Sequence, residues 1–489
     1  MEIKIMKKLA LLSLLTLFAV TGALAQQPQA TPPPPQAPRT VQLPKPVEKT
    51  LANGLRVIVV QRAEMPLVSA QLLVRSGGEV DPTEMAGVAD MTAALLTRGT
   101  TTRTATQIAE QIEALGGLIN SSARWDSSVV GVDVLSARID PAMQIMADVA
   151  RNPAFKDEEI ERLRRQNLNN LRVQLGQPGA IARFAAGRLI YRDAPYGHPL
   201  SGTPESLPRI KRDDIAGIHS TYYRPDNAIL VIGGDMTPEN GFALAEKYFG
   251  NWQKPTTPMR EVVVGTPVSE KGNRRILVID MPDAGQAAVL AAKTGISRNS
   301  PEYFPGIVSN AVLSGYSGRL NWEIRVKRGL SYGAGSALDT RRWAGSFTAT
   351  AQTKNESGAE VAALTLGEVS KLASDGVLDS ELTTRKASLI GGFARGLETT
   401  GGLVGQISSL AIYGLNFDEL NRFIGNVQSI KPEDVKKFAA ANLATDSTSL
   451  IVVGDARKFL ADLKKQFPDV EVIPIAELDL NSATLRRAK

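Results

Sequence analysis

The sequence of 489 residues contains no cysteine and only two histidines, His198 and His219. The lack of cysteine excludes disulfides, thiolate catalysis, iron–sulfur clusters and zinc sites with sulfur ligands. Two histidines are too few for any site that requires three imidazoles. Hydrophobic residues make up 43% and charged residues 22% of the chain, a balance that excludes most disordered proteins and suits two or three folded domains.

The N-terminal segment, positions 1–25, is typical of a secretory signal peptide. Three lysines precede an apolar run over 9–20, and Ala23-Leu24-Ala25 forms a small-residue cleavage site. We predict cleavage after Ala25 and a periplasmic protein. The apolar run is too short for a stable membrane span, and an uncleaved anchor is the alternative.

The mature chain is nearly neutral. The whole sequence carries a net charge of +6, and removal of a segment with three lysines and one glutamate lowers it to +4. No stripe of lysine and arginine interleaved with aromatic residues occurs, so we expect no nucleic-acid partner. Residues 26–46 hold eight of the 28 prolines and predict an extended tether.

Parts of the sequence match in the same order and at one constant separation. The segment 210–215 (Ile-Lys-Arg-Asp-Asp-Ile) matches 430–435 (Ile-Lys-Pro-Glu-Asp-Val). Asp226 and Asp446 each precede an apolar strand that ends in Gly-Asp. Because order and spacing agree at several segments, we predict a duplicated domain. The first copy spans 47–250 and the second 273–475, with a linker rich in proline over 251–272 and a C-terminal tail over 476–489.

Strand and helix patterns alternate within each half, which predicts an α+β fold. The first half is expected to hold helices over 87–96, 104–115, 157–175 and 213–222, strands over 53–60 and 68–75, and a hairpin over 118–134.

Five segments carry a resemblance to a known family. They are 53–57 (Asn-Gly-Leu-Arg-Val), 87–100 (Gly-Val-Ala-Asp-Met-Thr-Ala-Ala-Leu-Leu-Thr-Arg-Gly-Thr), 196–199 (Tyr-Gly-His-Pro), 202–207 (Gly-Thr-Pro-Glu-Ser-Leu) and 223–227 (Tyr-Arg-Pro-Asp-Asn). The chain resembles the pitrilysin/insulinase-type zinc peptidases, or inverzincins, and most nearly the bacterial two-repeat relatives of mitochondrial processing peptidase. The resemblance implies two homologous α/β-sandwich repeats, each a mostly antiparallel sheet with helices packed on it. It also implies that the repeats form half of a clam-shell chamber.

Active relatives carry H-x-x-E-H on the helix over 87–96, where two histidines bind zinc and the glutamate activates the zinc-bound water. A distal glutamate completes the three protein ligands. Here the histidine positions are Asp90 and Ala94, the base position is Ala93, and the distal glutamate falls at Asn169 or Asn170. The resemblance therefore implies no metal and no cofactor in this chain. A hydrolase with a different metal at Asp90 is a weak alternative, because nothing nearby supplies further ligands.

The segment 322–332 resembles the Arg/Tyr element of the family, which closes over the substrate beside the zinc. Arg325 takes the arginine position and Tyr332 the tyrosine position. An arginine offers donors to a substrate carbonyl or carboxylate, and a tyrosine hydroxyl donates to a developing oxyanion. The alternative is that Arg325 is one of several solvated helix cations, with Lys327 and Arg328, and that Tyr332 packs in a strand.

The segment 329–333 also matches the G-x-S-x-G pattern of serine hydrolases. A nucleophile elbow requires a histidine later in the chain, and none follows His219. We therefore reject a serine hydrolase.

A second candidate substrate surface begins at Gly116 and Gly117 and continues into Leu118, Ile119 and Asn120. In relatives the equivalent edge strand receives an extended peptide by β-augmentation. Glycine allows close approach of another backbone. A helix stop before an ordinary hairpin is an equally good interpretation.

Missing zinc ligands beside a retained Arg/Tyr pair predict a noncatalytic, substrate-contacting subunit. It would form a heterodimer with a homologous chain that bears H-x-x-E-H and supplies the zinc, and the pair would cleave peptides in the periplasm. The chain is not expected to act as a metallopeptidase on its own. The alternative, a stand-alone peptide-binding or scaffold protein, fits the same residues.

Overall fold

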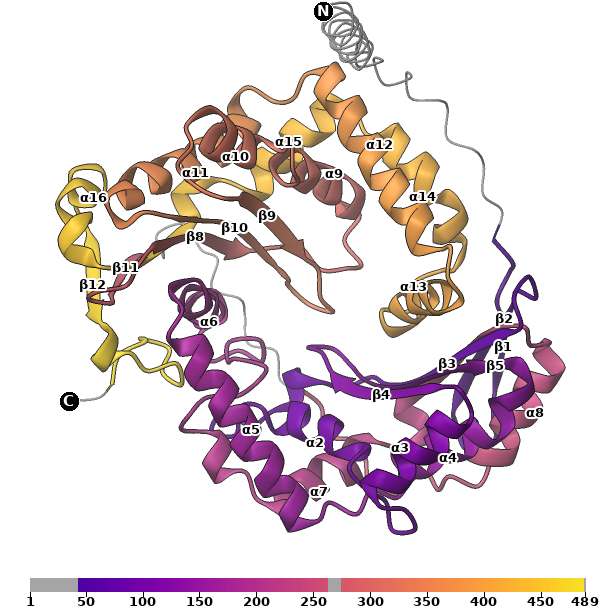
Figure 1. Cartoon of the computed structure of the whole chain (residues 1–489). Coiled ribbons are helices and arrows are strands. Elements are labelled where there is room, and N and C mark those ends of the chain that lie inside the picture. Colours follow the sequence, from indigo (N-terminus) through magenta and orange to yellow (C-terminus); the bar gives the residue numbers. More distant parts are fainter. Residues whose placement is uncertain (1–42, 263–273, 488–489) are drawn as a thin grey trace, which may run out of the picture. The chain divides into compact units, whose positions relative to one another are not determined.

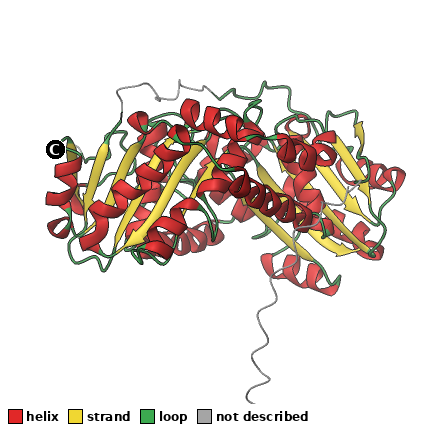
Figure 2. Ribbon diagram, turned by 90° about the horizontal axis from the view of Figure 1, so that it is seen from above, coloured by secondary structure: helices red, strands yellow, loops and turns green. Residues whose placement is uncertain are grey.

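The computed structural model describes residues 43–262 and 274–487, which form two six-stranded sheets with helices packed on them (Figures 1 and 2). The predicted signal peptide and most of the tether lie outside the described residues, as do positions 263–272 of the linker. No helix within the described ranges is long and apolar enough to cross a membrane.

The first sheet has the strand order β1-β2-β6-β3-β5-β4, and its only parallel pair is β2 with β6. Its strands are β1 (Val47–Thr50), β2 (Arg56–Gln61), β3 (Leu67–Val74), β4 (Leu118–Ala123), β5 (Ser128–Leu135) and β6 (Ala228–Gly234). The second sheet has the order β12-β7-β11-β8-β10-β9, with β7 parallel to both β12 and β11. Its strands are β7 (Ile276–Asp280), β8 (Ala287–Thr294), β9 (Ala334–Asp339), β10 (Ser346–Thr353), β11 (Ser449–Gly454) and β12 (Val470–Pro474).

The helices divide in the same way between the two halves of the chain. The first half holds α2 (Val88–Leu96), α3 (Ala105–Ala114), α4 (Ile139–Arg151), α5 (Asp157–Leu175), α6 (Pro178–Tyr191), α7 (Arg212–Tyr222) and α8 (Pro238–Phe249). The second half holds α9 (Tyr303–Leu313), α10 (Arg319–Asn321), α11 (Gly358–Ser374), α12 (Asp379–Gly396), α13 (Thr400–Ile412), α14 (Asp418–Ser429), α15 (Pro432–Asn442) and α16 (Leu460–Gln466).

The repeat seen in the sequence is also a repeat of structure. The interval along the sequence between β3 and β8 is the same as that between α7 and α15. It equals the interval between the matching sequence segments. The two helices even start alike, since Asp214 accepts a hydrogen bond from the N–H of Lys211 and Asp434 accepts one from Lys431. Five strands keep the same order in both sheets, and only the outer strands β1 and β12 differ. The expectation of two homologous repeats with mostly antiparallel sheets is confirmed.

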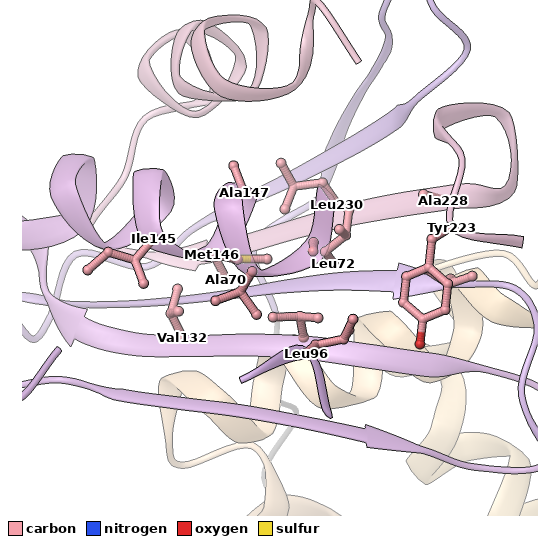
Figure 3. Close-up of a cluster of buried hydrophobic side chains, with 14 of the residues drawn as sticks. Ala70, Leu72, Leu96, Val132, Ile145, Met146, Ala147, Tyr223, Ala228 and Leu230 are labelled. Atoms are coloured by element: carbon pink, nitrogen blue, oxygen red, sulfur yellow. The ribbon is translucent and has the colours of Figure 1, made fainter. Parts of the chain in front are cut away.

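The first hydrophobic core lies between one face of the first sheet and the helices of its own half. Residues of β3 alternate, so that Ala70 and Leu72 point into this core and are fully buried. Figure 3 shows these side chains with those of β5, β6, α2 and α4 that meet them: Leu96, Val132, Ile145, Met146, Ala147, Ala228 and Leu230. The second sheet has an equivalent core on the matching face.

Each sheet is covered on its other face by a helix from the opposite half of the chain. α6 packs on β8 and β11, and α13 packs on β3 and β6 (Figure 1). Both faces of the central strands are therefore buried, which is why β2 and β7 are continuous apolar runs rather than alternating ones.

A buried carboxylate joins the two halves. Asp126, in the turn between β4 and β5, is 3% exposed and accepts hydrogen bonds from the Tyr196 hydroxyl, the Tyr413 hydroxyl at 3.0 Å and the Arg342 backbone N–H at 2.9 Å. The Arg342 guanidinium also donates to the backbone carbonyls of Asp126 and Arg75, at 2.8 and 2.9 Å. Charge-assisted hydrogen bonds of this kind are stronger than neutral ones.

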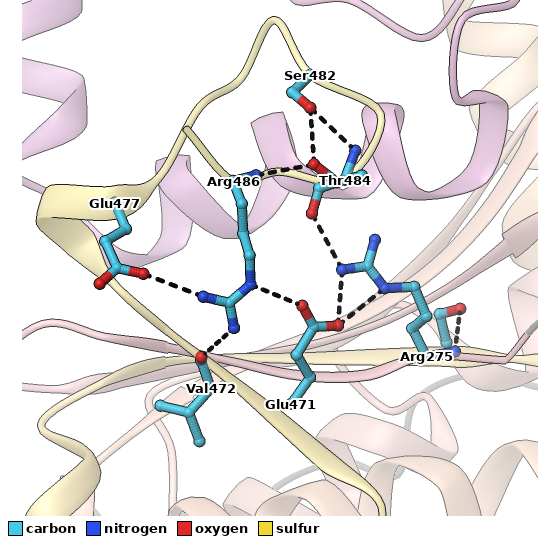
Figure 4. A network of polar contacts seen from close by, with 8 residues as sticks. Arg275, Glu471, Val472, Glu477, Ser482, Thr484 and Arg486 are labelled. Atoms are coloured by element: carbon cyan, nitrogen blue, oxygen red, sulfur yellow. Dashed lines mark hydrogen bonds and ion pairs between the residues drawn. The ribbon is translucent and has the colours of Figure 1, made fainter. Parts of the chain in front are cut away.

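The segment predicted as a C-terminal tail packs against the second sheet up to residue 487. Leu478, Leu480 and Leu485 are buried there. The guanidinium of Arg486 donates to Glu471, to Glu477 and to the Val472 carbonyl, and Glu471 also accepts from Arg275, which directly precedes β7 (Figure 4). These contacts tie the end of the chain to β12 and β7.

The junction at Asp126 predicts that Tyr413→Phe destabilises the folded chain. The change removes one donor to a buried carboxylate, and we expect a loss of about 1–3 kcal/mol in the free energy of unfolding, measured by urea denaturation. Tyr316→Phe is the matched control, because Tyr316 is 80% exposed. Equal stabilities of the two variants would show that the hydrogen bond contributes nothing.

Candidate functional site

The helix α2, which carries the positions of the family's zinc motif, is held at its start by a buried aspartate. Asp81 accepts hydrogen bonds from the N–H groups of Gly87 and Ala89, at 2.7 and 2.8 Å. Gly87 has a φ of +92°, and a Cβ there would lie 2.8 Å from the backbone of Gly202. The Ser206 hydroxyl donates to the Ala86 carbonyl at 2.8 Å. The loop over 202–207 therefore fixes where α2 begins.

On α2 itself, the three motif positions offer one polar group. Burial raises the pKa of Asp90 to about 6. Ala93 is fully buried in the core, and Ala94 packs beside the same core. A methyl group has no lone pair, so two of the three positions have nothing to give to a metal.

The distal positions lie on α5, which spans the residues predicted for it. Its buried face is formed by Ile160, Leu163 and Leu171. Asn169 and Asn170 are exposed, and the side-chain oxygen of Asn169 accepts a hydrogen bond from Arg172 at 3.1 Å. No hydrogen bond joins these amides to α2 within the described ranges.

This donor set does not suit zinc. Zinc sites in proteins use three or four nitrogen, sulfur or carboxylate ligands in tetrahedral geometry, whereas α2 and α5 present one carboxylate, two methyl groups and two exposed amides. Over residues 43–262 and 274–487, no group of three or more His, Asp or Glu side chains is placed to hold a metal.

Both histidines have structural partners. His219 lies in α7, where its Nε2 is 2.8 Å from the Ala150 carbonyl and its ring stacks on Tyr223. His198 is buried against Trp125, with Nε2 3.0 Å from the Gly78 carbonyl, and burial lowers its pKa to about 4.

The predicted peptide strand, β4, lies at one edge of the first sheet and packs beside α2. Both glycines before it have local roles. Gly116 has a φ of +65° and ends α3, and a Cβ on Gly117 would lie 2.2 Å from Val134. Leu118 is nevertheless 70% exposed, and Ile119 packs against the first core. The two glycines thus end α3 and allow close packing on Val134, while the edge of β4 is exposed at Leu118.

A hollow of about 590 Å³, here called the α13 groove, lies beside this strand. Asn120 and Ser122 of β4 line one side of it, and Gly405, Ser408 and Ser409 of α13 line the other. Asn120 of β4, a predicted substrate contact, therefore faces a groove whose opposite wall comes from the second half of the chain.

Arg325 lies in a π-helix, Trp322–Lys327. Its guanidinium lies over the ring of Tyr316, 5.3 Å from the centroid. The neighbouring cations differ, because Lys327 and Arg328 both pair with Glu323. Among the described residues no carboxylate pairs with Arg325. Arg325 thus differs from the two paired cations beside it, and π-helical turns often mark functional sites.

Tyr332 is 90% exposed just before β9. It stands at the rim of a hollow of about 430 Å³, here called the α6 groove, which lies between α6 and strands β8, β9 and β10. The adjacent Ser331 donates its hydroxyl hydrogen to the Gly333 carbonyl at 2.7 Å. Ser331, the serine of the rejected G-x-S-x-G pattern, therefore stabilises the turn that contains it.

The predicted site residues occupy four places. Asp90, Ala93 and Ala94 lie on α2, and the predicted peptide strand β4 lies beside them. Asn169 and Asn170 lie on α5, and Arg325 and Tyr332 lie before β9 in the other half. Within the described part of the chain, no hydrogen bond or ion pair joins Arg325 or Tyr332 to α2. Sequence reasoning missed the Asp126 junction, because none of its partners is near it in sequence.

Comparison with protein families decides the family. The model of the insulinase peptidases, peptidase family M16, matches residues 56–203, and the model of the peptidase M16 inactive domain matches residues 209–389. Together the two matches cover more than half of the chain. The chain belongs to the peptidase M16 (insulinase) family.

Individual M16 relatives agree with this assignment. The chain is 25% identical over 397 residues to an uncharacterised zinc protease of Mycobacterium leprae, covering 80% of this chain and 87% of the relative. It is 21% identical to an uncharacterised zinc protease of Bacillus subtilis, covering 83% and 97%. A crystal structure of a peptidase M16 inactive domain from Pseudomonas fluorescens matches with a TM-score of 0.78 at 26% identity, over 84% of this chain and 98% of that one.

The raised pKa of Asp90 gives a test of its surroundings in this M16 chain. Folding raises that pKa from 3.8 to about 6, so the folded chain loses stability as pH rises from 4 through 6 and Asp90 ionises. Asp90→Asn cannot ionise. We expect it to melt about 2 °C higher than the wild type at pH 8 and equally at pH 4, by differential scanning calorimetry.

Asp469→Asn, in the exposed turn before β12, is the control and should change neither melting temperature. A lower melting temperature of Asp90→Asn at pH 8 would show that the ionised carboxylate has a stabilising partner.

Proposed function

We propose that this chain is the noncatalytic, substrate-contacting subunit of a heterodimeric zinc metalloendopeptidase. The observation that carries the proposal is the contrast between two places in one M16 chain. On α2 the zinc-motif positions hold Asp90 and two alanines, of which Ala93 is fully buried, whereas Tyr332 is 90% exposed at the rim of a groove. A homologous partner with H-x-x-E-H would supply the zinc and the general base.

In the assembled pair, Arg325 and Tyr332 would reach the substrate bound to the partner's zinc. The guanidinium of Arg325 has donors free for a substrate carbonyl or carboxylate, since it pairs with no carboxylate among the described residues. The Tyr332 hydroxyl would donate to the oxyanion that forms as water attacks the scissile carbonyl.

The peptide would contact this chain along exposed backbone. β4 is an edge strand, and Leu118 on it is 70% exposed, which suits the addition of an extended peptide strand. The α13 groove beside β4 offers the polar side chains of Asn120 and Ser122. The signal-like residues 1–25 support a periplasmic location for the complex.

A second candidate function is a stand-alone periplasmic peptide-binding protein. The two grooves favour it, because neither depends on zinc or on a second chain. Both functions include peptide binding, so a peptidase assay and not a binding assay distinguishes them.

The subunit function predicts a peptidase activity that appears only in a mixture. Hydrolysis of a quenched fluorescent peptide is measured for this chain, for a homologue that bears H-x-x-E-H, and for both together, each with and without a chelator. We expect chelator-sensitive activity that rises sharply in the mixture. Activity no higher than that of the homologue alone would favour the stand-alone peptide-binding protein.

Within the mixture, Arg325→Ala and Tyr332→Phe are each expected to lower the turnover number by about 10²-fold, the scale of losing one oxyanion-type donor. Arg422→Ala on α14 and Tyr248→Phe on α8 are the matched controls. Unchanged turnover in both Arg325→Ala and Tyr332→Phe would remove the roles assigned to this pair.

Restoration of H-x-x-E-H on α2 tests whether the distal glutamate is needed as the third protein ligand of zinc. The triple variant Asp90→His, Ala93→Glu, Ala94→His recreates H-x-x-E-H but leaves Asn169 and Asn170 in place of the distal glutamate. We expect far less zinc-dependent cleavage by this variant alone than by the mixture. Cleavage at the rate of the mixture would show that the distal ligand is not needed.

A further inference from the structure

The α6 groove contains a single charged side chain. Its floor and walls are formed by small or uncharged residues of α6 and the second sheet, including Gly179, Ala182, Gln286, Thr350 and Gln352, and Arg183 is the only ionisable group besides the Tyr332 hydroxyl among the described residues that line it. A lone cation in otherwise neutral surroundings attracts an anion that nothing in the groove competes for.

The guanidinium of Arg183 lies close to the groove wall. A Cβ on Gly179 would be 3.7 Å from Arg183 Nη1 and 2.3 Å from Gln352 Nε2, so the absence of a side chain at Gly179 makes room for both groups. Gly179 also lies in the first turn of α6, where the positive end of the helix dipole adds to the attraction for an anion.

No acidic residue neutralises this cation. Among the described residues, no carboxylate lies within 4.0 Å of Arg183 in an ion pair, and the side chain is exposed. A second hollow, of about 360 Å³, shares Arg183 and Leu290 with the α6 groove and is also lined by Asp339. Asp339 is already paired with Arg341, at 2.7 Å. The charge of Arg183 is therefore available to a ligand.

The duplication shows that this helix position carries a charge in only one half of the chain. α5 and α12 begin at Asp157 and Asp379, and α6 and α13 begin at Pro178 and Thr400, so both pairs of helices have the same separation. At this separation Arg183 of the α6 groove corresponds to Gly405, which lines the α13 groove. The equivalent helix position thus holds an arginine at the α6 groove and a glycine at the α13 groove.

We propose that the α6 groove also holds part of the peptide and that Arg183 binds a carboxylate of it there, and so selects acidic peptides or peptide C-termini. This specificity rests on the proposed peptide-contacting function and deepens it. Arginine suits the task because its planar fork donates two parallel hydrogen bonds to a carboxylate. Tyr332 lines the same groove, so a peptide bound there would lie beside the tyrosine of the Arg/Tyr pair.

Peptide binding by the chain alone tests the proposal without any protease activity. Fluorescence anisotropy is measured with a labelled extended peptide in four forms, with an internal Asp or Asn and with a free or amidated C-terminus. We expect about tenfold tighter binding for a form that carries the preferred carboxylate, with the advantage reduced at high salt. The Asp/Asn and free/amidated comparisons separate a side-chain carboxylate from a terminal one.

Arg183→Gln should abolish this preference, and Arg183→Glu should reverse it toward a peptide with Lys at the same position. Arg165→Gln, exposed on α5, is the matched control and should keep the wild-type preference. Peptide binding that is equal for all four forms, or a preference that survives Arg183→Gln, overturns the role of Arg183 and leaves the proposed function standing. Absence of binding by every peptide would instead count against the peptide-contacting function itself.

Discussion

Asp126 receives hydrogen bonds from Tyr196, Tyr413 and Arg342, three residues that come from different loops and from both halves of the chain. An unpaired carboxylate buried to this extent would be costly, so the three donors have to be in place together. Nearby Glu79 is also buried, and burial raises its pKa to about 8 although Arg342 lies 3.3 Å away. Glu79 therefore acts mainly through hydrogen bonds at neutral pH, and Asp126 is the group that holds the loops beside the α13 groove.

Besides the Asp126 junction, the two halves are joined by the helices α6 and α13, each of which packs on the sheet of the opposite half. Because α6 covers the second sheet and α13 covers the first, each half needs the other to bury the second face of its central strands. The same packing creates the grooves, since each has a wall from one half and a floor from the other. The proposed peptide contact and the folding of the chain thus depend on one arrangement. The helix that forms one wall of each groove places Arg183 at the α6 groove and Gly405 at the corresponding position of the α13 groove.

Membership of the M16 family suggests a zinc site on α2, whereas the residues at the motif positions of α2 do not suit zinc. The family's fold is present in both halves, but the helix that would bind zinc holds Asp90 with its pKa near 6 and alanines packed in the core. The loop over 202–207 and Asp81 still fix the start of this helix. The helix therefore packs in the core and supports the neighbouring strand β4, while its motif positions hold a donor set that does not suit zinc.

The sequence by itself determined the repeat, the helix limits such as 157–175 for α5, and the chemistry missing from α2, because these follow from local patterns and from residue identity. It did not determine that Gly116 and Gly117 serve a helix stop beside an exposed edge, nor that Lys327 and Arg328 are paired while Arg325 is not. It also held no sign of the Asp126 junction or of the charge in the α6 groove. Those features join residues that lie far apart in the sequence, and only the packing of α6 and α13 on opposite sheets brings them together.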